Sequence, residues 1–282
     1  MLSRNPTHRV IEIVLIYIAL TAGALIAIAP LLWAISTSLK VAGKEFVIPI
    51  ELLPRPATLN NYRELFAHPI VKFGRGFKNS VIVSVPTTLG VIFVSSLAGF
   101  AFAKLKFPGR DAIFMVLLGT MMVPMAVRLI PQYLLMKSLG WLNTYYPLIV
   151  PVILTSVYGT FLMRQFMMTL PNDLLDSARV DGIRPFRMYT MLAMPLAKPA
   201  MITLAIITFM AAWNNFFLAI VYLTRPRMFV LQQSLAYMNS EYGVEWRLLM
   251  AGTIVAVIPV ILLFLALQKY YVQGITMSGL KG

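Results

Sequence analysis

The sequence predicts an all-α integral membrane protein with six transmembrane helices. Only 12% of its 282 residues are charged, whereas soluble domains carry roughly 25%. Hydrophobic residues make up 59% of the chain, and the mean hydropathy is +0.80. The apolar residues gather into six stretches, each close to the roughly 20 residues that cross a bilayer. The charge is too sparse to cover a water-soluble surface, so lipid is the solvent we expect.

The six expected spans follow one another along a single transmembrane domain over residues 1–282. The first is too long for a signal-peptide core and lacks a small-residue cleavage signal, so we interpret it as a retained anchor. Prolines inside the spans indicate either packing kinks or discontinuous helices around a solute path, and both readings stay open. The expected spans are 10–35, 80–103, 112–135, 146–166, 200–223 and 248–269.

Two long connections and a short tail lie outside the expected spans. Residues 36–79 hold several prolines and mixed charge, and residues 169–199 form a polar loop between the fourth and fifth spans. The tail covers 270–282. The total Lys and Arg count does not decide the orientation, but the short basic turn at 104–111 favours cytoplasmic termini.

The composition and motifs exclude several functions. The net charge of +14 would suggest nucleic acid in a soluble chain, but here basic residues between spans suit anionic lipid headgroups. There is no cysteine, and His8 and His68 are far apart, so we expect no metal site. Motifs for metalloproteases, serine hydrolases and phosphate-binding loops are absent. We therefore expect no catalytic residue and no cofactor on this chain.

The loop at 171–195, PNDLLDSARVDGIRPFRMYTMLAMP, predicts two short helices separated by a glycine. Asn172 is a good helix N-cap, and Gly182 is placed to end the first helix. Pro185 can open the second helix, because its missing N–H costs little at that position. An apolar stripe at helical spacing runs along the first helix: Leu174, Leu175 and Ala178.

This loop resembles the EAA loop of ATP-binding-cassette (ABC) importer permeases. Asp176, Ser177 and Ala178 stand in the Glu-Ala-Ala triplet, Gly182 is the glycine, and Pro195 closes the motif with no insertion. Departures from the family pattern are Asp for Glu, Ser for Ala, Leu for Ile and Met for Leu. The alternative is an unrelated polar loop with an incidental glycine. The context looks most like the carbohydrate branch, of the maltose and glycerol-3-phosphate type.

Further stretches extend the resemblance over nearly the whole chain, most weakly at 36–79. Residues 212–216, AWNNF, are similar to a tryptophan–asparagine segment of this branch, and 124–143 resemble its third span. The end, GITMSGLKG at 274–282, resembles the tail of the second permease subunit of maltose-type transporters.

The resemblance implies a permease subunit that is not itself an enzyme, in a bacterial or archaeal cytoplasmic membrane. Its partners would be a second permease, two ATPase subunits that bind ATP and Mg²⁺, and an extracytoplasmic solute-binding protein. The loop would be a cytoplasmic coupling helix that contacts the ATPase through Leu174, Leu175, Asp176, Ser177, Ala178, Arg179, Asp181 and Gly182. Tail contacts to the ATPase would come from Ser278, Gly279 and Lys281.

Polar residues inside the spans are candidates for a solute path. Trp213, Asn214 and Asn215 suit a hydroxyl-rich solute, or they bond neighbouring helices. Arg128 either snorkels to the outer interface or attracts an anionic solute. We prefer a carbohydrate, with glycerol-3-phosphate or its diesters as the alternative. A stand-alone secondary carrier is a remote alternative, because no Asp, Glu or His is expected deep in a span.

Overall fold

The computed structural model describes residues 6–48, 51–68, 71–238 and 245–279, with side chains described from 10 to 268 within these ranges. All regular structure in them is helical, which confirms the predicted all-α class. We expected one domain, and the internal contacts divide the chain into two compact units. One contains 1–70 and 237–257, and the other contains 71–236 and 258–282.

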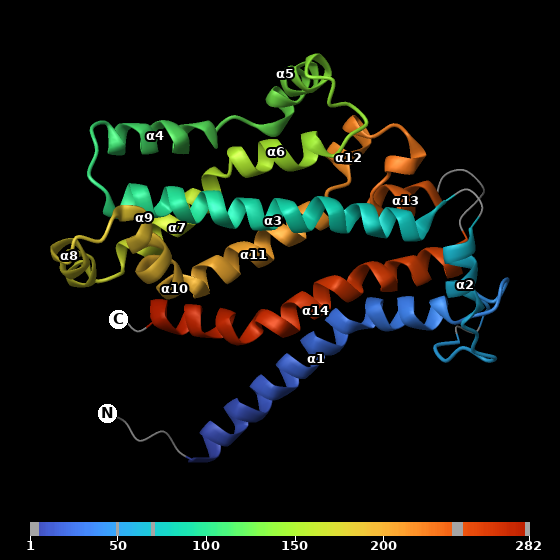
Figure 1. The fold of residues 1–282 in the computed structure, drawn as a ribbon. Coiled ribbons are helices and arrows are strands. Elements are labelled where there is room, and N and C mark those ends of the chain that lie inside the picture. The colour runs from blue at the N-terminus through green and yellow to red at the C-terminus, as the bar shows by residue number, and fades with distance from the viewer. Residues whose placement is uncertain (1–5, 49–50, 69–70, 239–244, 280–282) are drawn as a thin grey trace. The chain divides into compact units, whose positions relative to one another are not determined.

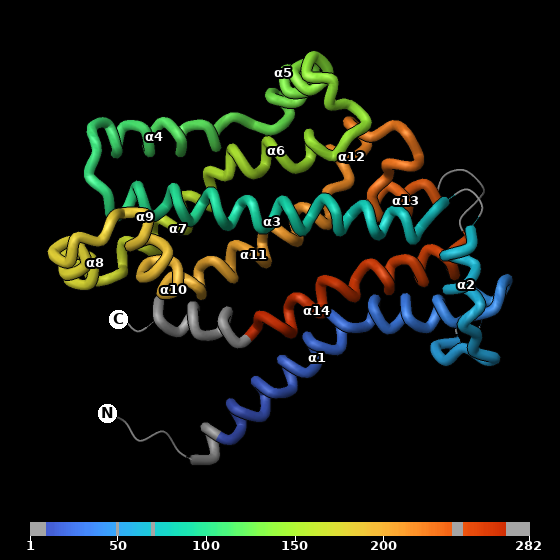
Figure 2. Tube along the Cα trace, viewed as in Figure 1, coloured from blue at the N-terminus to red at the C-terminus, as the bar shows by residue number. Residues whose placement is uncertain are grey.

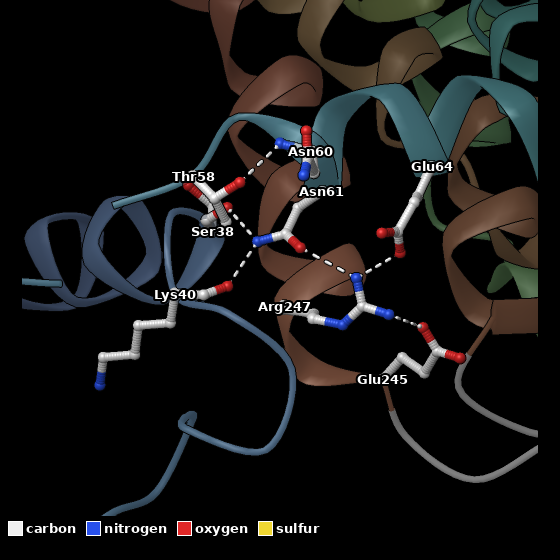
Figure 3. A network of polar contacts seen from close by, with 8 residues as sticks. All are labelled: Ser38, Lys40, Thr58, Asn60, Asn61, Glu64, Glu245 and Arg247. Atoms are coloured by element: carbon white, nitrogen blue, oxygen red, sulfur yellow. Dashed lines mark hydrogen bonds and ion pairs between the residues drawn. The ribbon is translucent and has the colours of Figure 1, made fainter. Parts of the chain in front are cut away.

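A buried asparagine organises the first unit, which holds α1 (Pro6–Ser38), α2 (Asn60–Ala67) and the start of α14 (Trp246–Gly279). Asn61 on α2 donates from its amide to the main-chain carbonyls of Ser38 (2.8 Å) and Lys40 (2.7 Å), and its oxygen accepts from Arg247 (2.9 Å). Figure 3 shows this network, in which Arg247 also pairs with the carboxylates of Glu64 and Glu245. One side chain thus joins the end of α1, α2 and the start of α14.

The second unit is built around α3 (Phe73–Lys104). Figure 1 shows it running between neighbouring helices, and it packs on α6 (Tyr146–Leu154), α7 (Val157–Met168) and α11 (Lys198–Trp213). The buried side of α3 is rich in small polar residues, whose hydroxyls mostly bond to the main chain one turn earlier. Small side chains let helix backbones approach closely where lipid gives no hydrophobic drive between helices.

Gly99 lies at a very close contact between α3 and α7. A Cβ there would lie 2.6 Å from the Cβ of Met163 and 2.8 Å from the main-chain nitrogen of Arg164. Four residues earlier, the Oγ of Ser95 stands 2.4 Å from the place a Cβ on Gly159 would occupy. The two helices therefore approach closely over a full turn.

The third expected span, 112–135, is not one straight helix. It is divided into α4 (Arg110–Thr120) and α5 (Met125–Ser138), which meet at 97° (Figure 2). Pro124 stands at the break with an extended ψ of 143°. Proline lacks an N–H and disfavours helix in the residue before it, so the break has a local cause.

The fourth and fifth expected spans are also interrupted. The fourth is α6 followed by α7, with a break at Thr155 and Ser156; the fifth is α11 followed by α12 (Phe217–Tyr222), with a break at 214–216. In the described residues four helices, with α6 and α7 counted together as one, are long and apolar enough to cross a membrane. The number rises to as many as six if two bent pairs, α4 with α5 and 185–196 with α11, each count as one span. The six-span count therefore stays a prediction. Two short elements follow α12, the 3₁₀ helix η2 (Pro226–Met228) and α13 (Leu231–Met238).

Gly99→Ala should lower the stability of the protein by about 1–3 kcal/mol, because the added methyl meets backbone that cannot move aside. Gly119→Ala in α4 is the matched control, since nothing lies within 4 Å of its added methyl. Thermal unfolding of the purified transporter in detergent measures both. Equal melting temperatures for the two variants would show that α3 and α7 are not in close contact.

Candidate coupling site

The loop between the fourth and fifth expected spans folds as two short helices separated by Gly182. They are α8 (Asn172–Val180) and α9 (Pro185–Met188), followed by the π-helical turn η1 (Tyr189–Ala193) and α10 (Met194–Leu196). Gly182 has φ +72°, its N–H bonds to Arg179 O (3.0 Å), and that of Ile183 bonds to Ala178 O (3.0 Å). This left-handed pattern satisfies the last carbonyls of a helix, so the prediction that Gly182 ends the first helix of the loop is confirmed.

The apolar stripe of α8 divides between the protein's interior and its surface. Leu175 and Ala178 are buried among α7 and η1 side chains such as Met163 and Tyr189. Leu174, in contrast, is 48% exposed. Leu175 and Ala178 therefore hold α8 on its own chain, and their contact with an ATPase stays a prediction.

Lys104, the last residue of α3, is bonded to both ends of α8. Its buried ammonium donates to the carbonyl of Leu170 (2.7 Å) and to Oδ1 of Asn172 (2.8 Å) at the start of the helix. Its main-chain carbonyl accepts from the guanidinium of Arg179 (3.0 Å) near the end of the helix. Hydrogen bonds from charged donors are stronger than neutral ones. Figure 1 shows α8 and α9 at this end of α3.

Tyr189 provides a second attachment to α3. The side chain is 1% exposed, its hydroxyl shares a hydrogen bond with Ser96 (2.7 Å), and its ring packs on Phe100 at 5.7 Å between centroids. Because Tyr189 follows α9 directly, both helices of the loop are fixed to the same helix. The polar loop is therefore attached to α3 through both of its helices.

The outward surface of the loop combines apolar and charged side chains. Val180 is 89% exposed and Phe186 61% exposed, and Asp176, Ser177 and Asp181 are exposed too. Asp176 pairs with Arg179 on the same helix, an exposed ion pair that adds little stability. A hollow of about 720 Å³ lies at the Gly182 turn, with Phe186, Arg184 and Arg187 on its wall. Exposed apolar groups with a charged rim are typical of a protein-binding surface.

The structure places the four candidate solute-path residues in different surroundings. Trp213 is 1% exposed and lies between Phe209 and Phe77, with ring centroids 5.5 Å from each, as a packed core residue does. Asn214 is exposed and accepts from Gln232 (3.2 Å), while Asn215 accepts from the N–H of Leu218 (3.2 Å). Arg128 is exposed on α5, away from the others along the chain.

Other expectations lie beyond what the structure describes. Ser278, Gly279 and Lys281 fall outside the residues whose side chains are described. Among the described residues, no group of three or more His, Cys, Asp or Glu side chains could hold a metal ion. Sequence reasoning missed Lys104 and Tyr189, because a lysine at a span end and a loop tyrosine carry no signal of their partners.

The family assignment agrees with this geometry. The sequence profile described as "Binding-protein-dependent transport system inner membrane component" matches residues 70–277, which include the polar loop and its attachments. The chain belongs to this family. It is a permease subunit of an ABC importer, and the match leaves out most of the long connection at 36–79, where the resemblance is weakest.

Relatives support the assignment over most of the chain. The arabinooligosaccharides transport system permease protein of Bacillus subtilis is 34% identical over 100% of both chains. The sn-glycerol-3-phosphate transport system permease protein of Salmonella typhi is 32% identical over 83% of this chain and 85% of its own. The fold is similar to that of a bacterial ABC transporter involved in the import of the acidic polysaccharide alginate, with TM-score 0.79, 22% identity and coverage of 96% of this chain and 100% of that one.

Lys104→Met should loosen α8 and lower stability by about 1.5–3 kcal/mol, because two charged hydrogen bonds are lost and Asn172 loses its donor. Lys106→Met is the matched control, as this neighbouring lysine is exposed. Limited proteolysis of membranes at the 169–199 loop, together with thermal unfolding, tests both variants. Protection of the loop in Lys104→Met equal to that in Lys106→Met would contradict the role of Lys104.

Proposed function

We propose that this permease subunit forms half of the translocation path for a sugar or sugar-like solute and couples ATP hydrolysis on a partner to alternating access. The single observation that carries the coupling role is the attachment of both ends of α8 to Lys104. A displacement of α8 would be transmitted directly to α3, because these bonds join the two helices without a flexible segment between them. Coupling of this kind moves an element as a rigid body.

The proposed partners are a second permease, two ATPase subunits that bind ATP and Mg²⁺, and an extracytoplasmic binding protein. Both termini and the loop would then be cytoplasmic. The outward surface of the loop supports contact with the ATPase: Leu174, Val180 and Phe186 offer apolar area, and Arg184 and Arg187 offer cations at its edge. Leu175 and Ala178 contribute indirectly by fixing the helix.

Glycerol-3-phosphate is the second candidate solute. The Salmonella typhi relative is named for that substrate, and the Bacillus subtilis relative is named for arabinooligosaccharides. A phosphate in the path would need cationic partners, and Arg128 is an exposed side chain on α5. We prefer the sugar.

Gly182→Pro should abolish uptake and solute-stimulated ATP hydrolysis while the protein still inserts into the membrane. Proline fixes φ near −65° and cannot adopt the +72° of this turn, so the end of α8 and the surface beside it must change. Gly182→Asn is the matched variant, because asparagine tolerates left-handed φ, and it should keep most activity. Both are measured in proteoliposomes with the complete transporter.

Normal solute-stimulated ATP hydrolysis in Gly182→Pro would contradict the coupling role of the loop. Failure of both variants to assemble would instead show that the turn serves folding only, and this is checked by co-purification with the ATPase.

A further inference from the structure

Two helix breaks meet at one cavity inside the second unit. Ser156 lies at the break between α6 and α7, and Asn215 lies at the break between α11 and α12; both line a cavity of about 220 Å³. Helix interruptions inside a membrane are tolerated where the freed groups line a cavity or a path. Ligand sites of transporters typically form at such breaks.

The two breaks lie at similar distances from a contact between the chain before α6 and the chain after α12. Asn143 binds the chain after α12, since its main-chain N–H donates to Tyr222 O (2.9 Å) and its Oδ1 accepts from Thr224 N (2.8 Å). The start of α6 and the end of α12 are therefore held near the same level. At the helical rise per residue, Ser156 lies about 15 Å from the start of α6. Asn215 lies about 10 Å from the end of α12 by the same measure.

The cavity wall carries hydrogen-bonding groups with unused capacity. Thr208 is 8% exposed and lines the cavity, and its hydroxyl has no bond to another described group. Thr203, on the same helix, instead bonds to the carbonyl of Pro199 (3.1 Å). The hydroxyls of Ser156 and Tyr158 and the amide nitrogen of Asn215 likewise have no bond to a described group, so four groups are left for a ligand.

The rest of the wall is apolar, and none of its residues, all between 83 and 215, is charged. A sugar ring combines hydroxyls with apolar C–H faces and matches such a wall, with the ring of Tyr158 available for stacking. A phosphate would be buried without a cation, which is strongly unfavourable. The volume is below the roughly 300–1,000 Å³ of sites for drug-sized ligands, so it suits one ring at a time.

We propose that this cavity is a solute site in the present subunit for one uncharged sugar ring, bound by Ser156, Tyr158, Thr208 and Asn215. The proposal rests on the proposed importer function and deepens it, because it names the site and selects neutral sugars over glycerol-3-phosphate. Trp213 is buried and does not line the cavity, so we expect it to pack the helix and not to contact the solute.

The chain has no cysteine, so single-cysteine labelling tests the site cleanly. Ser156→Cys and Thr208→Cys, with Thr203→Cys as the control, are placed in the complete transporter with its binding protein. Labelling by neutral N-ethylmaleimide is followed on this subunit with maltose, trehalose, arabinotriose or sn-glycerol-3-phosphate present. Uptake of each solute is measured in parallel. An imported sugar should slow labelling at 156 and 208 at least about threefold and leave 203 unchanged.

The Thr208→Val variant tests the site by transport kinetics. Loss of one hydrogen bond should raise the KM for sugar uptake about 2- to 10-fold, and Thr203→Val should leave it unchanged. If a sugar is taken up but slows labelling at neither position 156 nor position 208, the proposed site is wrong while the importer function is retained. Protection and uptake with glycerol-3-phosphate alone overturns the neutral-sugar assignment. If no solute is taken up, the proposed function fails and the site fails with it.

Discussion

Lys104 binds both ends of one short helix, and the functional interpretation of the chain depends on this interaction. The ammonium holds the start of α8, and the main-chain carbonyl of the same residue holds Arg179 near its end. A polar loop attached to a membrane helix at only one point could rotate about that point. Attachment at both ends, with Tyr189 as a further contact, makes the loop an extension of α3.

The position of Lys104 in turn depends on how α3 packs. Gly99 on α3 and Gly159 on α7 let the two helices approach so closely that a methyl group added at either position would clash with the other helix. Dispersion and hydrogen bonds must hold helices together in lipid, and both need short distances. α3 also packs on α6 and α11, the helices whose breaks border the cavity at Ser156 and Asn215. One helix therefore joins the coupling loop to the proposed solute site.

Much of this arrangement follows from local sequence. The glycine at 182 and the proline at 185 determine the two-helix loop, because each permits or enforces one backbone conformation. Long-range partners could not be predicted in the same way. The contacts of Lys104 with residues 170 and 172 and of Ser96 with Tyr189 join segments distant in sequence. Burial of Leu175 and Ala178 was missed because an apolar stripe does not say whether it faces its own core or a partner. From the sequence, Pro124 could mark either a packing kink or a discontinuous helix, and the 97° bend between α4 and α5 shows the second.

Rigid attachment of α8 to α3 is the central claim, and a distance measurement during the ATP cycle tests it most directly. Spin labels at Val180→Cys and Leu89→Cys would occupy exposed positions on α8 and α3, and double electron–electron resonance measures the distance between them. Closure of the ATPase on binding ATP is verified by a second label pair on the ATPase subunits. A rigid attachment predicts the same α8–α3 distance distribution with and without ATP. A distribution that shifts when the ATPase closes would contradict it.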